Sequence, residues 1–280
     1  MHGPWVTLVL PAVLAGLVAI LVTVAIERLG GLVGGILATL PSTIVPASLG
    51  MYAELDTPGL RAALCMVPMG MLLNAGFLWL WRALPPRLPA GSRTAQLTGM
   101  VVASLSVWCA GAMLLVVGAE RALHTGFEPL ALGTGGLALL LAFGGLACRV
   151  GVPAPRGRNR VSAMALLVRG GLAASAVAIA LGIAALGQPL MAGAASVFPS
   201  IFLTAMVSLW WSQGRAVSGG AVGPMMLGSA SVAAYAVLAA VALPALGAVA
   251  GVLLSWSVAV GGVSVPAALW LRSRRPVRSV

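Results

Sequence analysis

The chain has 280 residues, of which 60% are hydrophobic and only 8% are charged, and its formal net charge is +11. A water-soluble domain of this composition would carry an apolar surface, so the composition excludes an ordinary soluble globular protein. All basic residues are arginines, and they gather in short segments between apolar runs rather than along one face, which argues against a nucleic-acid partner.

Long apolar runs follow one another along almost the whole chain. A transmembrane helix needs about 20 mostly apolar residues, and about nine segments meet this requirement. The first run lacks a basic leader and is too long for the apolar part of a signal peptide, so we expect it to stay in the protein. The sequence therefore predicts an all-α, polytopic integral membrane protein. In chain order, the expected helices are 5–26, 29–52, 59–82, 96–118, 127–148, 163–186, 188–212, 218–241 and 245–271.

The arginines also predict an orientation. If the chain crosses the membrane nine times, one side collects thirteen arginines, and the other side holds only Arg61 and Arg121. Cytoplasmic loops of membrane proteins carry an excess of Arg and Lys. We therefore expect a bacterial cytoplasmic (inner) membrane protein with its N-terminus outside and its C-terminus in the cytoplasm.

Two segments in different halves of the chain resemble each other. Gly34–Ser42 reads GGILATLPS and Ala192–Ser200 reads AGAASVFPS, which aligns a Pro-Ser pair in each. Two weaker matches keep the same order along the chain: Val67–Met69 with Gly223–Met225, and Leu105–Trp108 with Leu253–Trp256.

These matches predict two four-helix repeats, at 5–118 and 163–271, joined by a connector helix at 127–148 and followed by a cytoplasmic tail at 272–280. The connector adds one crossing, so the second repeat would enter the membrane from the opposite side. The two repeats are thus expected to be inverted relative to each other.

The segment Ala25–Gly31, AIERLGG, continues to ATLP at Ala38–Pro41. It resembles a small bacterial family of four-helix membrane proteins of unknown function, close to the GlpM-like proteins associated with alginate production. The resemblance covers residues 8–118 and, more faintly, 164–270, where Ala184–Gln188 lacks the Glu-Arg pair. It implies a fused pair of such units and transfers no substrate or catalytic residue. The inverted halves are also loosely similar in architecture to drug/metabolite transporters, which usually have ten helices.

The aligned Pro-Ser pairs are the first candidate substrate-binding site. A proline inside a membrane helix removes a backbone donor and opens the helix. Neighbouring hydroxyls then either contact a ligand or repair the freed backbone in a simple packing kink. Both alternatives stay open. The candidate residues are Pro41, Ser42 and Thr43 in the first repeat, and Pro199, Ser200 and Thr204 in the second.

Other polar or aromatic side chains are expected at membrane depth. Asn74 would either join two helices or contact a substrate, because an unpaired amide in lipid is costly. Trp108, Trp256 and Tyr235 would either line a cavity or belong to the packed core.

Three charged residues are candidates for gating or charge recognition. Arg169 lies about two turns inside its helix, where it would either pair with an anionic substrate or extend to the cytoplasmic surface. Glu27 and Arg28 interrupt an apolar run and would form either a tight cytoplasmic turn or a gating ion pair.

No enzyme signature is visible: the sequence places no histidine, no paired carboxylates and no phosphate-binding loop at membrane depth. The two isolated histidines and three cysteines in apolar runs predict no metal site, and no cofactor is expected. The leading hypothesis is a small secondary transporter or facilitator with an unknown small-molecule substrate and a midplane site. The alternative is a non-transporting subunit accessory to envelope polysaccharide export or assembly. A lipid-acting enzyme ranks third. The bilayer is the expected partner, and the protein would be a monomer or a homodimer.

Overall fold

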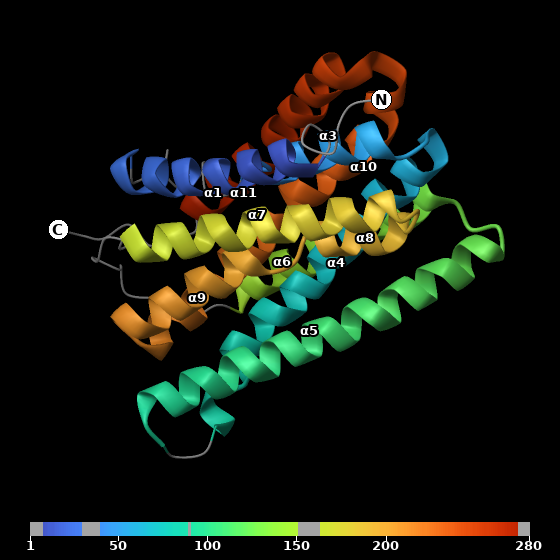
Figure 1. Ribbon diagram of the computed structural model, residues 1–280. Coiled ribbons are helices and arrows are strands. Elements are labelled where there is room, and N and C mark those ends of the chain that lie inside the picture. The colour runs from blue at the N-terminus through green and yellow to red at the C-terminus, as the bar shows by residue number, and fades with distance from the viewer. Residues whose placement is uncertain (1–7, 30–39, 89–90, 151–162, 274–280) are drawn as a thin grey trace.

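The computed structural model in Figure 1 describes residues 8–29, 40–88, 91–150 and 163–273, with only the backbone given for 25–29, 212–213 and 215–218. All regular secondary structure in these residues is helical. The expectation of an all-α fold therefore holds for the part of the chain that the structure describes.

The first half of the chain contributes four α-helices, a single 3₁₀ turn and a further helix that leads to the second half. Capping explains two of the helix starts: Asp56 accepts a hydrogen bond from the Gly59 N–H at 2.9 Å, and Ser92 accepts one from the Ala95 N–H at 3.2 Å. The elements are α1 (Leu10–Leu29), α3 (Ile44–Glu54), α4 (Thr57–Ala83), η2 (Pro85–Arg87), α5 (Arg93–His124) and α6 (Pro129–Arg149).

The second half is more interrupted. The apolar run predicted at 188–212 forms two helices rather than one, and the runs predicted at 218–241 and 245–271 are nearly continuous. At Gly247 the backbone is not helical (φ 77°, ψ 176°), so α10 consists of two helices that meet at a kink. The elements are α7 (Ala163–Ala185), α8 (Pro189–Ser196), α9 (Ser200–Gln213), α10 (Arg215–Ala259), the π-helical turn η3 (Val260–Ser264) and α11 (Val265–Ser273).

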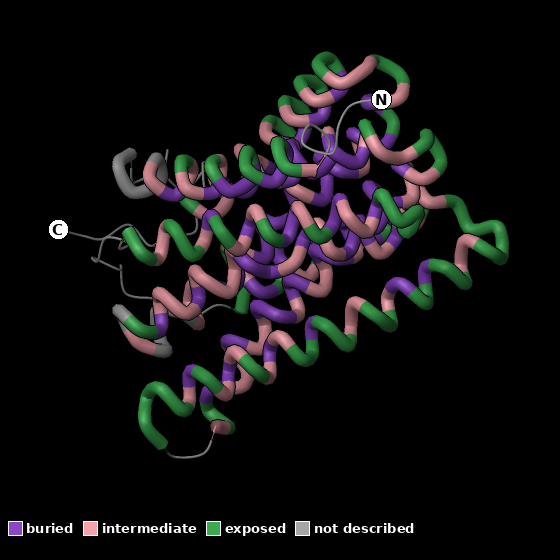
Figure 2. Tube along the Cα trace, in the orientation of Figure 1, coloured by how far each residue is buried: buried purple, intermediate pink, exposed green. Residues whose placement is uncertain are grey.

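Helices α4 and α10 pack against each other in the middle of the molecule, and α6 packs against both. Around them, α1 packs along α7, and α8 lies against both α4 and α7. Figure 1 shows α5 as a long helix along one outer edge. Figure 2 shows buried residues concentrated in the central helices and exposed residues along α5 and the outer faces.

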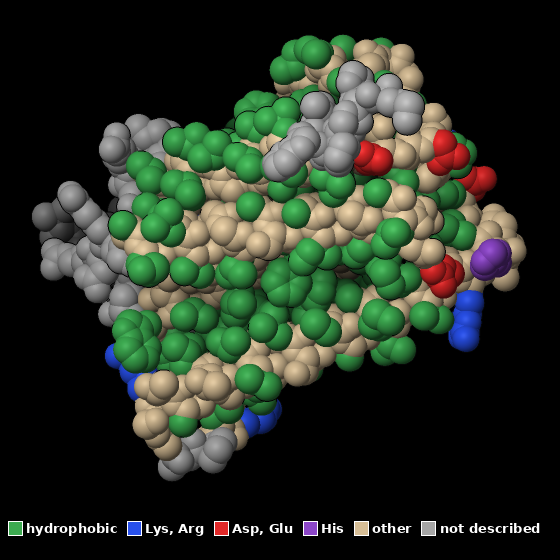
Figure 3. Space-filling view, viewed as in Figure 1, with side chains coloured by type: hydrophobic (Ala, Val, Ile, Leu, Met, Phe, Trp, Pro, Cys, Tyr) green, Lys and Arg blue, Asp and Glu red, His purple; other side chains and the backbone are tan. Residues whose placement is uncertain are grey.

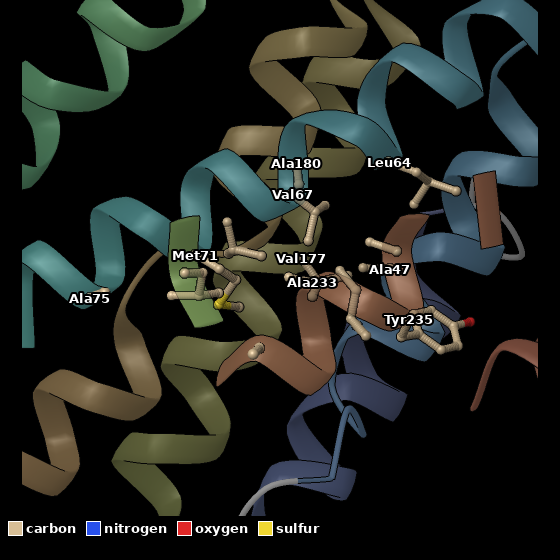
Figure 4. Close-up of a cluster of buried hydrophobic side chains, with 14 of the residues drawn as sticks. Ala47, Leu64, Val67, Met71, Ala75, Val177, Ala180, Ala233 and Tyr235 are labelled. Atoms are coloured by element: carbon tan, nitrogen blue, oxygen red, sulfur yellow. The ribbon is translucent and has the colours of Figure 1, made fainter. Parts of the chain in front are cut away.

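Small side chains let these helices approach closely. Ala233 of α10, Ala180 of α7 and Ala47 of α3 are buried in one hydrophobic cluster with Leu64 and Val67 of α4. Figure 4 shows side chains from all four helices converging there. Helix packing in membranes depends on such close contact, because lipid supplies little hydrophobic drive for helix association.

Six helices in the described residues are long and apolar enough to cross a membrane. The last of them, Gly219–Ser273, has 55 residues and contains the Gly247 kink. Large hydrophobic side chains also point outward, with Leu186 exposed at 78% and Val249 at 75%. Helix length and composition therefore support a multi-pass membrane protein with lipid around its outer surface.

The charged side chains separate toward the two ends of the helices. In the face shown in Figure 3, acidic atoms gather at the right-hand end, where α3 and α5 terminate in Figure 1. Basic atoms lie mainly at the opposite, left-hand end. The long apolar surface between the two ends is the part that lipid would cover.

Candidate functional site at the helix breaks

The helix that contains Pro199 is interrupted. α8 ends at Ser196, α9 begins at Ser200, and Pro199 lies at the N-cap position of α9. The Ser200 N–H donates a hydrogen bond to the carbonyl of Phe198, at 2.7 Å, across the proline. This bond spans only two residues, so the chain makes a tight turn at the break.

The aligned position in the first half makes the same turn. The Ser42 N–H donates to the carbonyl of Leu40, at 2.8 Å, across Pro41, and α3 begins two residues later at Ile44. Pro41 is buried, and Ser42 and Thr43 are half-buried. The side chain of Thr43, at the N-cap position, makes no capping hydrogen bond. The two Pro-Ser pairs thus share a local backbone geometry as well as a sequence.

Asn74 of α4 lies against the break between α8 and α9. Its Nδ2 donates to the carbonyl of Val197, at 2.8 Å, and its Oδ1 accepts from the Trp108 Nε1 of α5, at 2.7 Å. Asn74 is 1% exposed. The Trp108 ring also packs edge-on against Phe198, with ring centroids 5.2 Å apart. One amide therefore joins α4, α5 and the broken helix, which favours its interpretation as an interhelical contact.

Two glycines bring α4 and α8 close together beside this amide. A Cβ on Gly193 of α8 would collide with the backbone carbonyl of Ala63, and a Cβ on Gly70 of α4 would collide with the side chain of Val197. Gly193 belongs to the repeated segment in which the Pro-Ser pair lies. Close approach of the two backbones is the physical reason for glycine at Gly193, and room for the Val197 side chain is the reason at Gly70.

Arg169 forms a second polar cluster. Its guanidinium donates to the Thr23 hydroxyl of α1 at 2.9 Å and to the Thr204 hydroxyl of α9 at 3.2 Å. Thr204 in turn donates to a carbonyl of its own first turn, that of Ser200 at 2.9 Å or Ile201 at 3.0 Å. Arg169 is half-buried and connects three helices, so the side chain lies among protein hydroxyls rather than simply extending along the surface.

The remaining predicted residues lie apart from these clusters. Tyr235 of α10 is fully buried, and its hydroxyl lies 2.8 Å from that of Ser48 in α3. Trp256 is half-buried at the edge of the core. The side chains of Glu27 and Arg28 lie outside the described residues.

The structure thus brings together Asn74, Trp108 and the Pro199 break in one contact network, and Arg169 with Thr204 in another. Sequence reasoning missed Thr23 and Ser48, the hydroxyl partners of Arg169 and Tyr235. Each is a hydroxyl residue within an apolar run, and this is the only sequence signal that could have indicated a buried polar contact. Among the described residues, no three His, Cys, Asp or Glu side chains group as metal ligands would.

No family model, curated protein or solved structure matches this chain. What is established is a helical membrane protein with several apolar spans. The comparisons identify no family.

Proposed function

We propose that the chain is a small secondary transporter or facilitator that works by alternating access between two inverted repeats. The observation that carries this proposal is the matching turn at Pro41–Ser42 and Pro199–Ser200, with the same two-residue hydrogen bond at each. Broken helices in corresponding positions of two inverted halves are typical of substrate sites in such transporters.

The packing of the helices supports this interpretation. In this arrangement α1 corresponds to α7, α4 to the part of α10 before the Gly247 kink, and α5 to the part after it. A pseudo-twofold axis would then pair α1 with α7 and α4 with α10. Both pairs are in contact, and the connector α6 contacts α4 and α10 alike. Under this assignment, about nine crossings result, because the broken α8–α9 segment spans once and the kinked α10 with α11 spans twice.

The break at Ser200 is closed in this conformation, because Pro199 and Ser200 are both buried. Alternating access therefore requires α8–α9 to separate from α4 in a second conformation. The Asn74–Val197 hydrogen bond and the contacts at Gly193 and Gly70 would then have to break. These interactions lie at one interface, that of α4 with the broken helix, so one rigid movement of the broken helix releases them together.

The test is cysteine accessibility from each face of the membrane. Cys65, Cys109 and Cys148 are first replaced by alanine, and a single cysteine is then placed at Ser42 or Ser200. A membrane-impermeant thiol reagent is applied from either side. We expect both positions to react, with the reactive side changing between conditions.

A cysteine at Thr125, in the turn between α5 and α6, serves as the reactive control. If this control reacts while Ser42 and Ser200 are protected from both faces under every condition, there is no aqueous pathway at the breaks and the transport proposal fails.

The alternative proposal is a non-transporting subunit accessory to envelope polysaccharide export or assembly, which the GlpM-like resemblance also favours. The observation on its side is the close packing of the Pro199 break, where Asn74, which accepts from the Trp108 N–H, donates to the Val197 carbonyl. It predicts a partner that co-purifies in a fixed ratio from native membranes. It also predicts protected cysteines at both breaks, so the same labelling experiment separates the two proposals.

A further inference from the structure

A groove of about 370 Å³ opens on the outer surface between α5, α7 and α9. Its volume falls within the range of about 300–1,000 Å³ typical of ligand pockets. Figure 3 shows hydrophobic side chains over the hollow between α7 and α5. The residues that form its walls include Val101 of α5, Val168 and Leu172 of α7, and Leu203 and Val207 of α9.

The groove is lined mainly by apolar side chains, and its polar side chains are those of Thr204 and Ser208. Thr204, which also lines it, directs its hydroxyl to a carbonyl of its own helix and to Arg169. A polar solute would therefore find few free partners there. In a membrane, a sideways-opening apolar groove is a place for a hydrocarbon chain.

The helices α5 and α9, which form two walls of the groove, also carry Arg93 and Trp211, which contact each other. On α5, Val101 follows Arg93 by eight residues, a spacing that keeps both within one broad face of the helix. On α9, Trp211 follows Thr204 by seven residues, on the face that lines the groove. The Arg93 guanidinium lies over the Trp211 ring, 5.5 Å from its centroid, and one of its NH2 groups donates to the Trp210 carbonyl.

This pair has the chemistry of a membrane–water boundary. Trp211 is 55% exposed, and Arg93 is exposed at the start of α5. Aromatic rings of this kind concentrate at the level of lipid headgroups. A basic side chain beside them attracts the phosphate of an anionic lipid. Arg93 and Trp211 do not line the groove itself but lie farther along α5 and α9, where the phosphate of a lipid with its chain in the groove can reach them.

We infer that this groove binds one acyl chain of an anionic phospholipid, with the phosphate group at Arg93. The lipid belongs to the leaflet at the arginine-rich end of the molecule. The acyl chain runs between α5 on one side and α7 and α9 on the other. The bound lipid thereby stabilises α5 in its place at the outer edge of the molecule. The inference is independent of any transport activity.

The experiment is native mass spectrometry of the full-length protein, purified in mild detergent and then titrated with phosphatidylglycerol or phosphatidylcholine. The wild type should retain one tightly bound phospholipid and prefer phosphatidylglycerol by about fivefold, the effect of one arginine near the surface. Val101→Trp fills the groove and should remove this lipid. Val102→Trp is the matched control, because Val102 is exposed outside the groove.

Arg93→Gln should bring the two lipids to equal affinity, and Arg93→Lys should restore most of the preference for phosphatidylglycerol. Arg87→Gln is the charge control, since Arg87 is also exposed near that end of the helices and donates only to the nearby carbonyl of Ala83, the last residue of α4.

Retention of the lipid by Val101→Trp would overturn the inference, as would an unchanged preference in Arg93→Gln. Displacement of the lipid by a water-soluble metabolite from the same cells would show instead that the groove is a small-molecule site, and would also overturn it.

Discussion

Asn74 donates a hydrogen bond from its Nδ2 to the backbone carbonyl of Val197, 2.8 Å away and 123 residues later in the chain. Val197 is the C-cap residue that follows α8, so its carbonyl lacks the amide that a continuous helix would supply. The side chain of one helix thus compensates for the break in another. This relationship links the stability of the fold to the position of the break.

Asn74→Ala should destabilise the protein by about 1–3 kcal/mol, because it leaves the Val197 carbonyl and the Trp108 N–H buried without these partners. Thermal unfolding of the purified protein in detergent measures the loss. Thr134→Ala is the control, since Thr134 is exposed and bonds only carbonyls of its own helix. An Asn74→Ala protein as stable as the control would show that the network contributes nothing measurable.

Pro199→Ala should partly rescue the Asn74→Ala protein. With a donor restored at position 199, the segment can continue as a helix, and the Val197 carbonyl can accept from the N–H of Ile201 in place of Asn74. The free energy of unfolding of the double variant should therefore be higher, by about 1 kcal/mol, than the value obtained by adding the effects of the two single variants. Strict additivity in this double-mutant cycle would mean that the break persists without its proline.

The sequence singles out the turn at Pro41 and the break at Pro199 because a proline within an apolar run removes a backbone donor. Proline alone does not decide, since Pro68 of α4 and Pro224 of α10 lie inside continuous helices. The sequence also predicts most helix positions, since apolar length is the main determinant of a membrane helix. The helix expected at 163–186, for example, runs from Ala163 to Ala185. Local composition is sufficient for the position of such a helix.

Partnership between distant residues was not predictable in the same way. The pattern leaves Asn74 equally suited to a helix contact and to a substrate, and only the packing of α4 against α8 shows that its amide reaches the Val197 carbonyl and the Trp108 N–H. Likewise, the equivalence of Trp108 and Trp256 in the aligned segments does not extend to their surroundings, because Trp108 is 6% exposed and Trp256 is half-buried. Such contacts depend on how helices cross, which a single sequence does not encode locally.

Thr204→Val should weaken the attachment of α9 to α7. Valine keeps the shape of threonine but removes the hydroxyl that accepts from the Arg169 guanidinium, and a hydrogen bond to a charged group contributes about 1.5–3 kcal/mol. We expect a lower unfolding temperature and faster amide hydrogen exchange in α9. Thr134→Val, the same change at an exposed site, should leave both unchanged. Equal effects in the two variants would rule out a particular role for the Arg169 cluster.

The arginine distribution predicts a C-terminus in the cytoplasm. Green fluorescent protein fused after Val280 should fluoresce, and alkaline phosphatase fused at the same place should be inactive. Alkaline phosphatase inserted after Gly126, in the turn between α5 and α6, should be active. The reverse pattern would place the arginine-rich end outside and contradict the predicted orientation.

Gly247→Ala should destabilise the protein by about 1–3 kcal/mol, because φ of 77° with ψ of 176° is a conformation that essentially only glycine adopts. The kink lets the chain fold back, and it brings Gly251 close to Ala242, where a Cβ on Gly251 would lie 2.9 Å from the Ala242 carbonyl oxygen. Gly251→Ala should therefore be destabilising as well, through packing rather than backbone strain.

Gly135→Ala in α6 makes the matched comparison for both changes. A Cβ there meets no atom within 4 Å, so the substitution should stabilise the helix by about 0.5–1 kcal/mol. The same chemical change thus has opposite expected signs at positions 247 and 135. If Gly247→Ala were as stable as Gly135→Ala in thermal unfolding, the two arms of α10 would not meet at a glycine-dependent kink, and the assignment of two crossings to residues 219–273 would lose its structural basis.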